Sequence, residues 1–165
     1  MATVHLKGTP LQTIGTLPKV GSNAPDFSLT ASDLSDKSLN DFSGKNIILN
    51  IFPSIDTGTC AQSVRSFNKM VAAKDNTVVL CISKDLPFAQ TRFCGAEGLE
   101  NVVNLSDFKT GKFGGDYGLS FTEGPLAPLH SRAVVVTDTN GKVIYTEQVI
   151  EIVDEPNYEA ALAVL

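Results

Sequence analysis

The feature that most constrains this chain is a short apolar run that leads through a turn into a helix with a cysteine in its first turn. Residues 47–52 are mostly apolar, which is typical of a buried strand. Residues 53–58 have the composition of a turn, and apolar residues then recur at helical spacing from Cys60 to Phe67. Backbone N–H groups and the helix dipole stabilise a thiolate at such a position.

Two interpretations of this cysteine are open from the local pattern. In the first, Cys60 is a nucleophile, and the hydroxyl of Thr57 can bond both the thiolate and an oxygen of a substrate. Pro53 would then end the strand and, lacking an N–H, shape the pocket floor. In the second, Cys60 is a small core residue and Thr57 caps the helix.

Composition favours one globular domain over residues 1–165. The chain is 42% hydrophobic and 19% charged, with a net charge of −5 and no block of lysine or arginine. We therefore expect no binding to nucleic acid and no membrane association. No apolar run approaches the length of a membrane span, and residues 1–19 lack the layout of a signal peptide, so the expected location is cytoplasmic.

Cysteine usage favours redox chemistry. Cys60, Cys81 and Cys94 are odd in number and far apart, and no Cys-x-x-Cys occurs, which suits neither a secreted disulfide framework nor a zinc site. His5 and His130 are isolated, so we expect no metal site and interpret both, like Asp56, as solvated or structural. Cys81 lies within an apolar run, which predicts core packing.

The order of elements predicts an α/β thioredoxin-like fold with an added N-terminal β-hairpin. Strands are expected at residues 4–7, 11–14, 27–30, 47–52, 77–83, 101–105, 132–137 and 142–146, and helices at 59–74, 88–94, 108–117 and 156–165. Gly95 and Gly98 are expected to end the second helix. In the polar segment 33–42, apolar contacts with the core are expected from Leu34, Leu39 and Phe42.

Two longer motifs bring a resemblance to a known family. Residues 50–58 read Asn-Ile-Phe-Pro-Ser-Ile-Asp-Thr-Gly, and residues 85–90 read Asp-Leu-Pro-Phe-Ala-Gln, with Cys94 just after. Together with Cys60, these motifs resemble the bacterial thiol peroxidases, which are atypical two-cysteine peroxiredoxins. The resemblance covers nearly the whole chain. One departure is Thr59, where the family more often has valine.

The resemblance implies a role for each matched residue. Cys60 corresponds to the peroxidatic cysteine, whose thiolate takes an oxygen from a hydroperoxide and becomes a sulfenic acid. Thr57 and Pro53 belong to the same active-site motif. Arg132 corresponds to the family's active-site arginine, although without the resemblance an exposed arginine at a strand edge would be expected. Cys94 corresponds to the resolving cysteine, which closes an intrachain disulfide.

The glycines after Cys94 suggest a segment that unravels easily, so we expect both cysteine segments to rearrange between the thiol and disulfide states. Phe88 and Phe93 are expected either to cover the active-site pocket or to pack in the core.

The resemblance therefore implies a homodimeric, thioredoxin-dependent peroxidase that acts on hydrogen peroxide and on alkyl or lipid hydroperoxides without a cofactor. A general thiol–disulfide oxidoreductase is a weaker alternative, because no Cys-x-x-Cys is present. A non-enzymatic peroxide sensor or redox relay would use the same residues. Turnover separates these, since a sensor needs a single oxidation and a specific partner.

Overall fold

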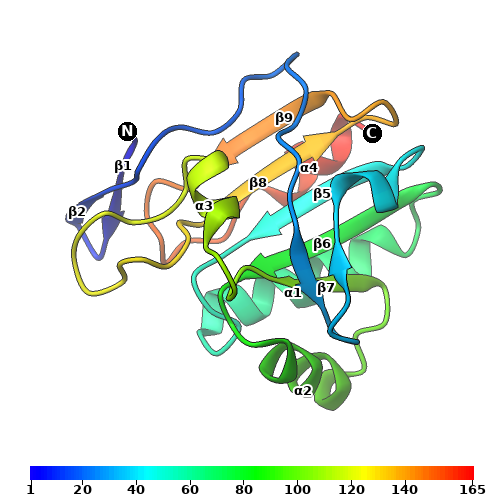
Figure 1. The fold of residues 1–165 in the computed structure, drawn as a ribbon, viewed down its shortest axis with the longest axis horizontal. Helices are drawn as coiled ribbons and strands as arrows, with labels where there is room; N and C mark the ends of the chain where they lie inside the picture. Colours follow the sequence, from blue (N-terminus) through cyan, green and yellow to red (C-terminus); the bar gives the residue numbers. More distant parts are fainter.

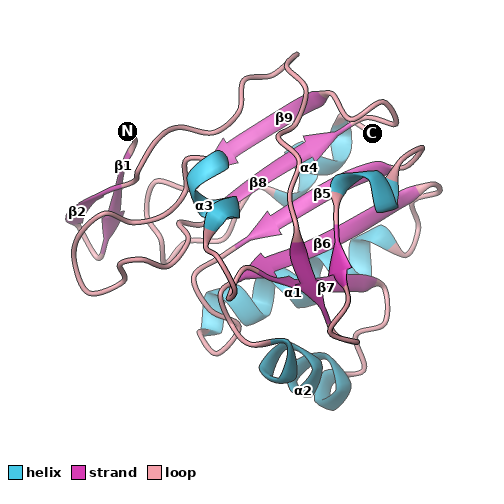
Figure 2. Ribbon diagram, viewed as in Figure 1, coloured by secondary structure: helices cyan, strands magenta, loops and turns pink.

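The computed structural model describes residues 1–165 as a seven-stranded mixed sheet with helices on both faces and a two-stranded hairpin at one end (Figures 1 and 2). The strands are β1 (Thr3–Leu6), β2 (Thr9–Gln12), β3 (Leu29–Ala31), β4 (Asp36–Lys37), β5 (Asn46–Ile51), β6 (Thr77–Ser83), β7 (Val102–Ser106), β8 (Ala133–Thr137) and β9 (Val143–Gln148). The helices are the 3₁₀ turn η1 (Leu39–Phe42), α1 (Gly58–Val71), α2 (Pro87–Glu97), α3 (Lys112–Asp116) and α4 (Tyr158–Ala163).

The centre of the sheet is built from the apolar runs of the sequence. Its strand order is β4-β3-β7-β6-β5-β8-β9, in which β5 is parallel to β6, and β6 to β7, while β8 runs antiparallel to β5. Strands β5 and β6 are mostly buried because they are covered on both sides. Helix α1 connects them, and the loop of residues 52–57 leads from the carboxyl end of β5 to its N-terminus.

Two apolar cores lie on opposite faces of the sheet. On one face, α1 contributes Cys60, Val64 and Phe67, and α4 contributes Ala161. Helix α2 covers the β7 side of this same face (Figure 1). The opposite core contains Phe113 of α3, with η1 packed against it. The thioredoxin-like fold with an N-terminal hairpin is thus confirmed, and no helix combines the length and apolar character needed to cross a bilayer.

The second predicted helix differs from its expected form. Helix α2 runs on to Glu97, so Gly95 lies inside it and Cys94 is followed by another helical turn. The helix ends at Gly98, whose positive φ of 65° places it in the left-handed region and whose N–H donates to the Cys94 carbonyl. One interior glycine costs only about 1 kcal/mol relative to alanine, which tertiary contacts offset. The predicted helix at 108–117 was also too long, since α3 has 5 residues.

Two apolar side chains were placed wrongly. Leu34 is 52% exposed and does not anchor its segment, whereas Leu39 and Phe42 do pack against the core. Phe88 is 66% exposed, so it neither covers the pocket nor enters the core. Phe93 is partly buried against the core cluster beneath α1. The two wrong predictions, for Leu34 and Phe88, have one cause: apolar residues in short turns and first helical turns need not face the sheet.

Candidate active site

The site begins at the N-terminus of α1. Thr57 occupies the N-cap position in extended conformation, and Ala61 donates the first intrahelical bond to its carbonyl, at 2.9 Å. The N–H groups before Ala61 have no partner within the helix, because they belong to its open first turn. Cys60 lies in that turn and is fully buried. The helix therefore presents backbone donors and its positive end to the space around the sulfur.

Arg132 lies directly against Cys60. Its Nη2 donates to Cys60 Sγ at 3.3 Å, and its Nε donates to the Ile152 carbonyl at 3.0 Å. The guanidinium is 2% exposed, and its Nη1 has no hydrogen-bond partner within the protein. The guanidinium thus places a positive charge directly beside the sulfur. The unpaired Nη1 leaves a donor for an oxygen of a bound substrate.

Thr57 and Pro53 complete the polar and apolar floor of the site. The Thr57 hydroxyl donates to the Ser54 carbonyl at 3.0 Å, and no hydrogen bond joins it to Cys60. Because a hydroxyl also accepts, its lone pairs remain for a substrate O–H. Pro53 is buried one residue after Phe52, whose N–H donates to β6 at the Ile82 carbonyl. Pro53 has no N–H, so no unpaired backbone donor remains where the hydrogen bonds between β5 and β6 end.

A cavity of about 280 Å³ opens over these residues. Its lining is Leu6, Pro53, Thr57, Gly58, Thr59, Leu126, Arg132, Ile152 and Val153. Leu6 comes from the N-terminal hairpin and Leu126 from the loop before β8, so segments remote in sequence form an apolar wall. No local pattern in the sequence marks Leu6, Leu126 or Ile152 as residues that line the cavity.

The wall containing Ile152 and Val153 is fixed on two sides. The Ile152 carbonyl accepts from Arg132, and the Val153 carbonyl accepts from the Thr59 hydroxyl at 2.8 Å. A valine at this position, which is more common in the family that the sequence resembles, could not donate a hydrogen bond to the Val153 carbonyl. Thr59 therefore ties the first turn of α1 to the segment that follows β9.

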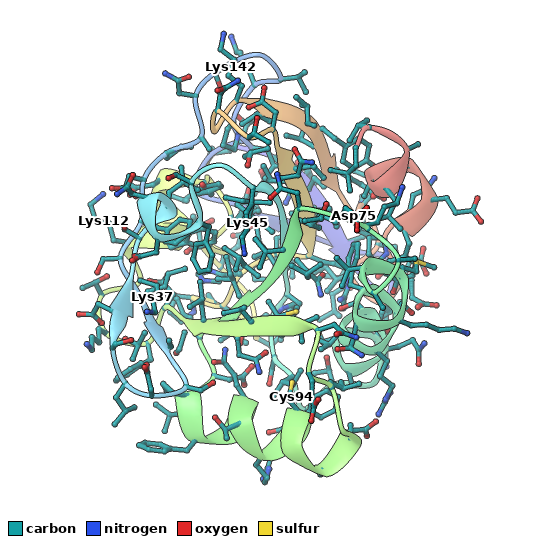
Figure 3. The ribbon with its side chains drawn as sticks, turned by 90° about the vertical axis from the view of Figure 1, so that its right-hand side faces the viewer. Lys37, Lys45, Asp75, Cys94, Lys112 and Lys142 are labelled. Atoms are coloured by element: carbon teal, nitrogen blue, oxygen red, sulfur yellow. The ribbon has the colours of Figure 1, made fainter.

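Cys94 lies on the side of α2 that faces the sheet (Figure 3). Asn104 on β7 donates from Nδ2 to Cys94 Sγ at 3.1 Å. Burial raises the pKa of the Cys94 thiol, with the Asn104 donor opposing the shift and the Glu97 carboxylate adding to it. Cys60 and Cys94 are both free thiols, so the fold described is the reduced form.

A row of polar side chains across the sheet supports both cysteine helices. Asn50, Cys81 and Asn104 are paired neighbours on β5, β6 and β7 and share one face. Asn50 donates to Ser63 of α1 at 3.1 Å, and the Ser63 hydroxyl donates to the Cys60 carbonyl at 2.8 Å. Cys81 is fully buried between the two amides, and burial raises its pKa to about 12. The prediction that Cys81 packs in the core is confirmed.

The remaining titratable candidates lie outside this site. His130 is fully buried with its Nε2 3.2 Å from Asp107, which makes it structural rather than solvated. Asp56 is exposed and pairs with Arg92 of α2 at 2.9 Å. No three or more histidine, cysteine, aspartate and glutamate side chains are grouped as a metal site requires.

The chain is similar to known proteins over nearly its whole length. The family model described as Redoxin matches residues 19–162. The thiol peroxidases of Mycobacterium tuberculosis and Mycobacterium bovis are each 56% identical over 165 residues, covering 100% of this chain and 99% of theirs. A peroxiredoxin-like protein from Aquifex aeolicus superposes with a TM-score of 0.92 at 37% identity, covering 99% of this chain and 96% of its own. A thiol peroxidase from Chromobacterium violaceum shares the fold, with a TM-score of 0.91 at 24% identity over 98% of this chain and 94% of its own.

Proposed function

This chain belongs to the redoxin family and is a thiol peroxidase, and from that premise we propose that it reduces hydroperoxides with Cys60 as the attacking thiolate and Cys94 as the resolving thiol. The observation that carries this assignment is the buried Arg132 guanidinium, 3.3 Å from Cys60 Sγ, with its Nη1 unpaired beside the cavity.

In the first step, the Cys60 thiolate attacks the terminal oxygen of the hydroperoxide. A sulfur–oxygen bond forms as the oxygen–oxygen bond breaks, giving Cys60 sulfenic acid and an alkoxide or hydroxide, which takes up a proton as alcohol or water. The sulfur is oxidised by two electrons and the peroxide is reduced by two. No cofactor takes part, because the sulfur carries both electrons.

The surrounding groups each have a task in this step. Arg132 holds the thiolate with Nη2 and offers Nη1 to the oxygen on which negative charge develops. Thr57 accepts the O–H of the peroxide and aligns it with the sulfur. Pro53 forms the apolar floor beside them. The charge-stabilising contribution is large because Arg132 is already desolvated before the substrate arrives.

In the second step, the Cys94 thiol condenses with the sulfenic acid, and a disulfide and water are formed. The two sulfurs accept hydrogen bonds from different parts of the sheet. Cys60 accepts from Arg132, next to β8, while Cys94 accepts from Asn104 on β7. Strands β5 and β6 lie between these donors, which separates β7 from β8 by about 14 Å. A disulfide requires Cα atoms within about 7 Å, and we propose that both cysteine segments rearrange to reach it.

An external dithiol then reduces the disulfide and is itself oxidised. We assign this role to thioredoxin, whose potential of about −270 mV suits it, and we propose a cytoplasmic homodimer as the working form, in line with the family resemblance. The apolar wall formed by Leu6, Leu126 and Ile152 favours alkyl and lipid hydroperoxides alongside hydrogen peroxide.

The test is to treat the reduced protein with one equivalent of cumene hydroperoxide and to map the products by non-reducing mass spectrometry. We expect a Cys60–Cys94 link within one chain, sulfenic acid at Cys60 in Cys94→Ser, and no peroxide consumption by Cys60→Ser. Cys81→Ser is the matched control and should behave as wild type. Full activity in Cys60→Ser would overturn the assignment, and a lasting sulfenic acid in wild type would instead favour a relay to a partner protein.

A further inference from the structure

Asp85, just before the helix that carries Cys94, accepts hydrogen bonds from the loop that precedes the Cys60 helix and from the end of β6. It lies between β6 and α2, within the motif that precedes Cys94. Its Oδ1 accepts from the Ser54 hydroxyl at 2.7 Å, and its Oδ2 accepts from the Ile55 N–H at 2.7 Å and from the Ser83 hydroxyl at 2.6 Å. A half-buried carboxylate with three such donors is held firmly, because bonds to an ionised acceptor are short and strong.

On one side, these bonds reach the residues that prepare Cys60. Ser54 and Ile55 follow Pro53 directly and precede Thr57. The Ser54 carbonyl accepts from both the N–H and the hydroxyl of Thr57, at 3.2 and 3.0 Å. Asp85 therefore fixes the peptide that orients the proposed peroxide-binding hydroxyl and starts α1.

On the other side, the same carboxylate helps to attach α2. Ser83, which donates to Asp85, also accepts from Gln90 Nε2 at 3.2 Å, and Gln90 donates further to the Leu105 carbonyl at 3.1 Å. Pro87 and Gln90 are the fully buried residues of α2, and Phe93 and Cys94 are partly buried where they pack against the core. The polar contact of Gln90 with Ser83 thus supplements a narrow apolar contact surface.

Apart from the packing of Phe93 and Cys94 against the core that contains Cys60, the other links between α2 and the Cys60 region are solvent-exposed ion pairs. Arg92 pairs with Asp56 where both side chains are more than 60% exposed, and Arg65 of α1 pairs with Glu97 at 39% and 34% exposure. Exposed ion pairs contribute little individually. The Asp85 cluster, defined as Ser54, Ile55, Ser83 and Asp85, is therefore the main polar connection between the two regions.

We infer that Asp85 is a positioning residue that couples the two cysteine segments, holding residues 53–57 in place for peroxide reduction and keeping α2 folded until Cys60 is oxidised. The inference rests on the proposed function, in which both segments rearrange to form the disulfide. It predicts opposite effects on the two chemical steps. Loosening the cluster disorders the peroxide site, which slows oxidation, but it also removes bonds that must break before the disulfide closes, which speeds closure.

The experiment is a rapid-mixing time course with hydrogen peroxide, in which thiol, trapped sulfenic acid and disulfide are counted by mass spectrometry. Mass detection suits this chain because it contains no tryptophan. In Asp85→Asn the acceptor loses its negative charge, and the amide NH2 faces either the Ser54 hydroxyl or the Ile55 N–H and Ser83 hydroxyl, so the cluster loses at least one bond to a charged oxygen. We expect Cys60 oxidation to slow about tenfold, as for the loss of one bond to a charged acceptor, and disulfide closure to be faster than in wild type.

Two further variants keep the test decisive. Ser54→Ala removes the bond to Oδ1 together with the 3.2 Å bond that the Ser54 hydroxyl accepts from the Asp56 N–H, and it should show the same opposite effects in weaker form. Asp75→Asn, on an exposed turn well separated from α2 in Figure 3, is the matched control and should leave both rates unchanged. Thermal unfolding of each variant shows whether the fold is retained.

Unchanged rates in Asp85→Asn, or both rates reduced together with a loss of thermal stability, would overturn the coupling role. Those results would leave the proposed function intact as long as wild type forms sulfenic acid and then the disulfide. If wild type itself forms neither, the proposed function fails, whatever the Asp85 variants do.

Discussion

Arg132 Nη2 lies 3.3 Å from Cys60 Sγ, although the two residues are 72 positions apart in the chain. The contact follows from sheet register: β8 pairs antiparallel with β5, with Ala133 opposite Ile51. Arg132 therefore enters the sheet where β5 gives way to the loop and helix that carry Cys60. The arginine and the cysteine meet because the last residue of one strand is opposite the first residue of another.

Replacing Arg132 by lysine should slow the reaction of Cys60 with peroxide. A single ammonium cannot keep the bond to the Ile152 carbonyl while it also contacts the sulfur and a substrate oxygen, as the guanidinium fork does. We expect a loss of roughly a hundredfold in kcat/KM, the order found when a preorganised donor is removed. The measurement is peroxide consumption at limiting substrate.

The control for this substitution is Arg65→Lys on the partly exposed side of α1. It changes the same side chain in the same way and should leave the peroxide rate as in wild type. Equal rates for the Arg132 and Arg65 variants would remove Arg132 from the proposed step.

Much of the fold could be predicted because most of its strands coincide with short apolar runs in the sequence. The strand expected at residues 77–83 has those bounds in β6, since a continuous apolar stretch between turn signals is unambiguous when both faces are buried. Helix α2 was harder, because its residues have no apolar stripe and Gly95 resembles a helix stop. Its true end is the left-handed Gly98, which local composition could not distinguish from Gly95.

The candidate site divides in the same way. Pro53, Thr57 and Cys60 lie close together in the sequence, where a strand leads into a helix, so the local pattern alone could mark them as candidates. Arg132 came from family resemblance alone, because a contact over 72 positions depends on strand register. Asp85 belongs to a motif that carries the family resemblance, but its own role could not be predicted, since a single acidic residue before a helix is common in loops and its partners are known only from the structure.

Thr59→Val tests the bond that distinguishes this chain from the valine-bearing pattern. The substitution keeps the shape of the side chain but removes its 2.8 Å hydrogen bond to the Val153 carbonyl. We expect the free energy of unfolding to fall by about 1 kcal/mol. Because Val153 lines the cavity, KM for cumene hydroperoxide should rise more than KM for hydrogen peroxide.

Thr77→Val is the matched control, because the Thr77 hydroxyl also donates to a backbone carbonyl, that of Asp75, but far from the cavity. It should lower stability without changing the ratio of the two KM values. If Thr59→Val leaves that ratio at the wild-type value, the bond serves stability alone.

The pKa of Cys94 provides a test of its surroundings. Burial raises this pKa above its ordinary value of 9.0, because the thiolate loses hydration, so alkylation by iodoacetamide should have a midpoint above 9.0. Asn104→Leu should move the midpoint higher, since the lost N–H stabilised the thiolate, whereas Glu97→Gln should move it lower. The measurement is the pH profile of labelling in a background where Cys60 and Cys81 are serine. Shifts of the reverse sign would mean that Cys94 is not held at Asn104 in solution.

Cys81 should make the protein less stable at alkaline pH. Burial raises its pKa from 9.0 to about 12 in the folded state, so between these values the unfolded chain loses a proton that the folded chain keeps. The stabilising effect of the neutral thiol is thus complete below pH 9.0 and decreases as the pH rises toward 12. One such proton changes the free energy of unfolding by up to about 1.4 kcal/mol per pH unit.

In urea titrations under reducing conditions, Cys81→Ala should be less stable than wild type at neutral pH, because it leaves a cavity, yet lose stability less steeply above pH 9.0. Tyr145, whose pKa is raised to about 12, remains in both proteins, so the difference between the two slopes isolates the cysteine. Parallel curves would show that the Cys81 thiol ionises as readily in the folded protein as in the unfolded chain.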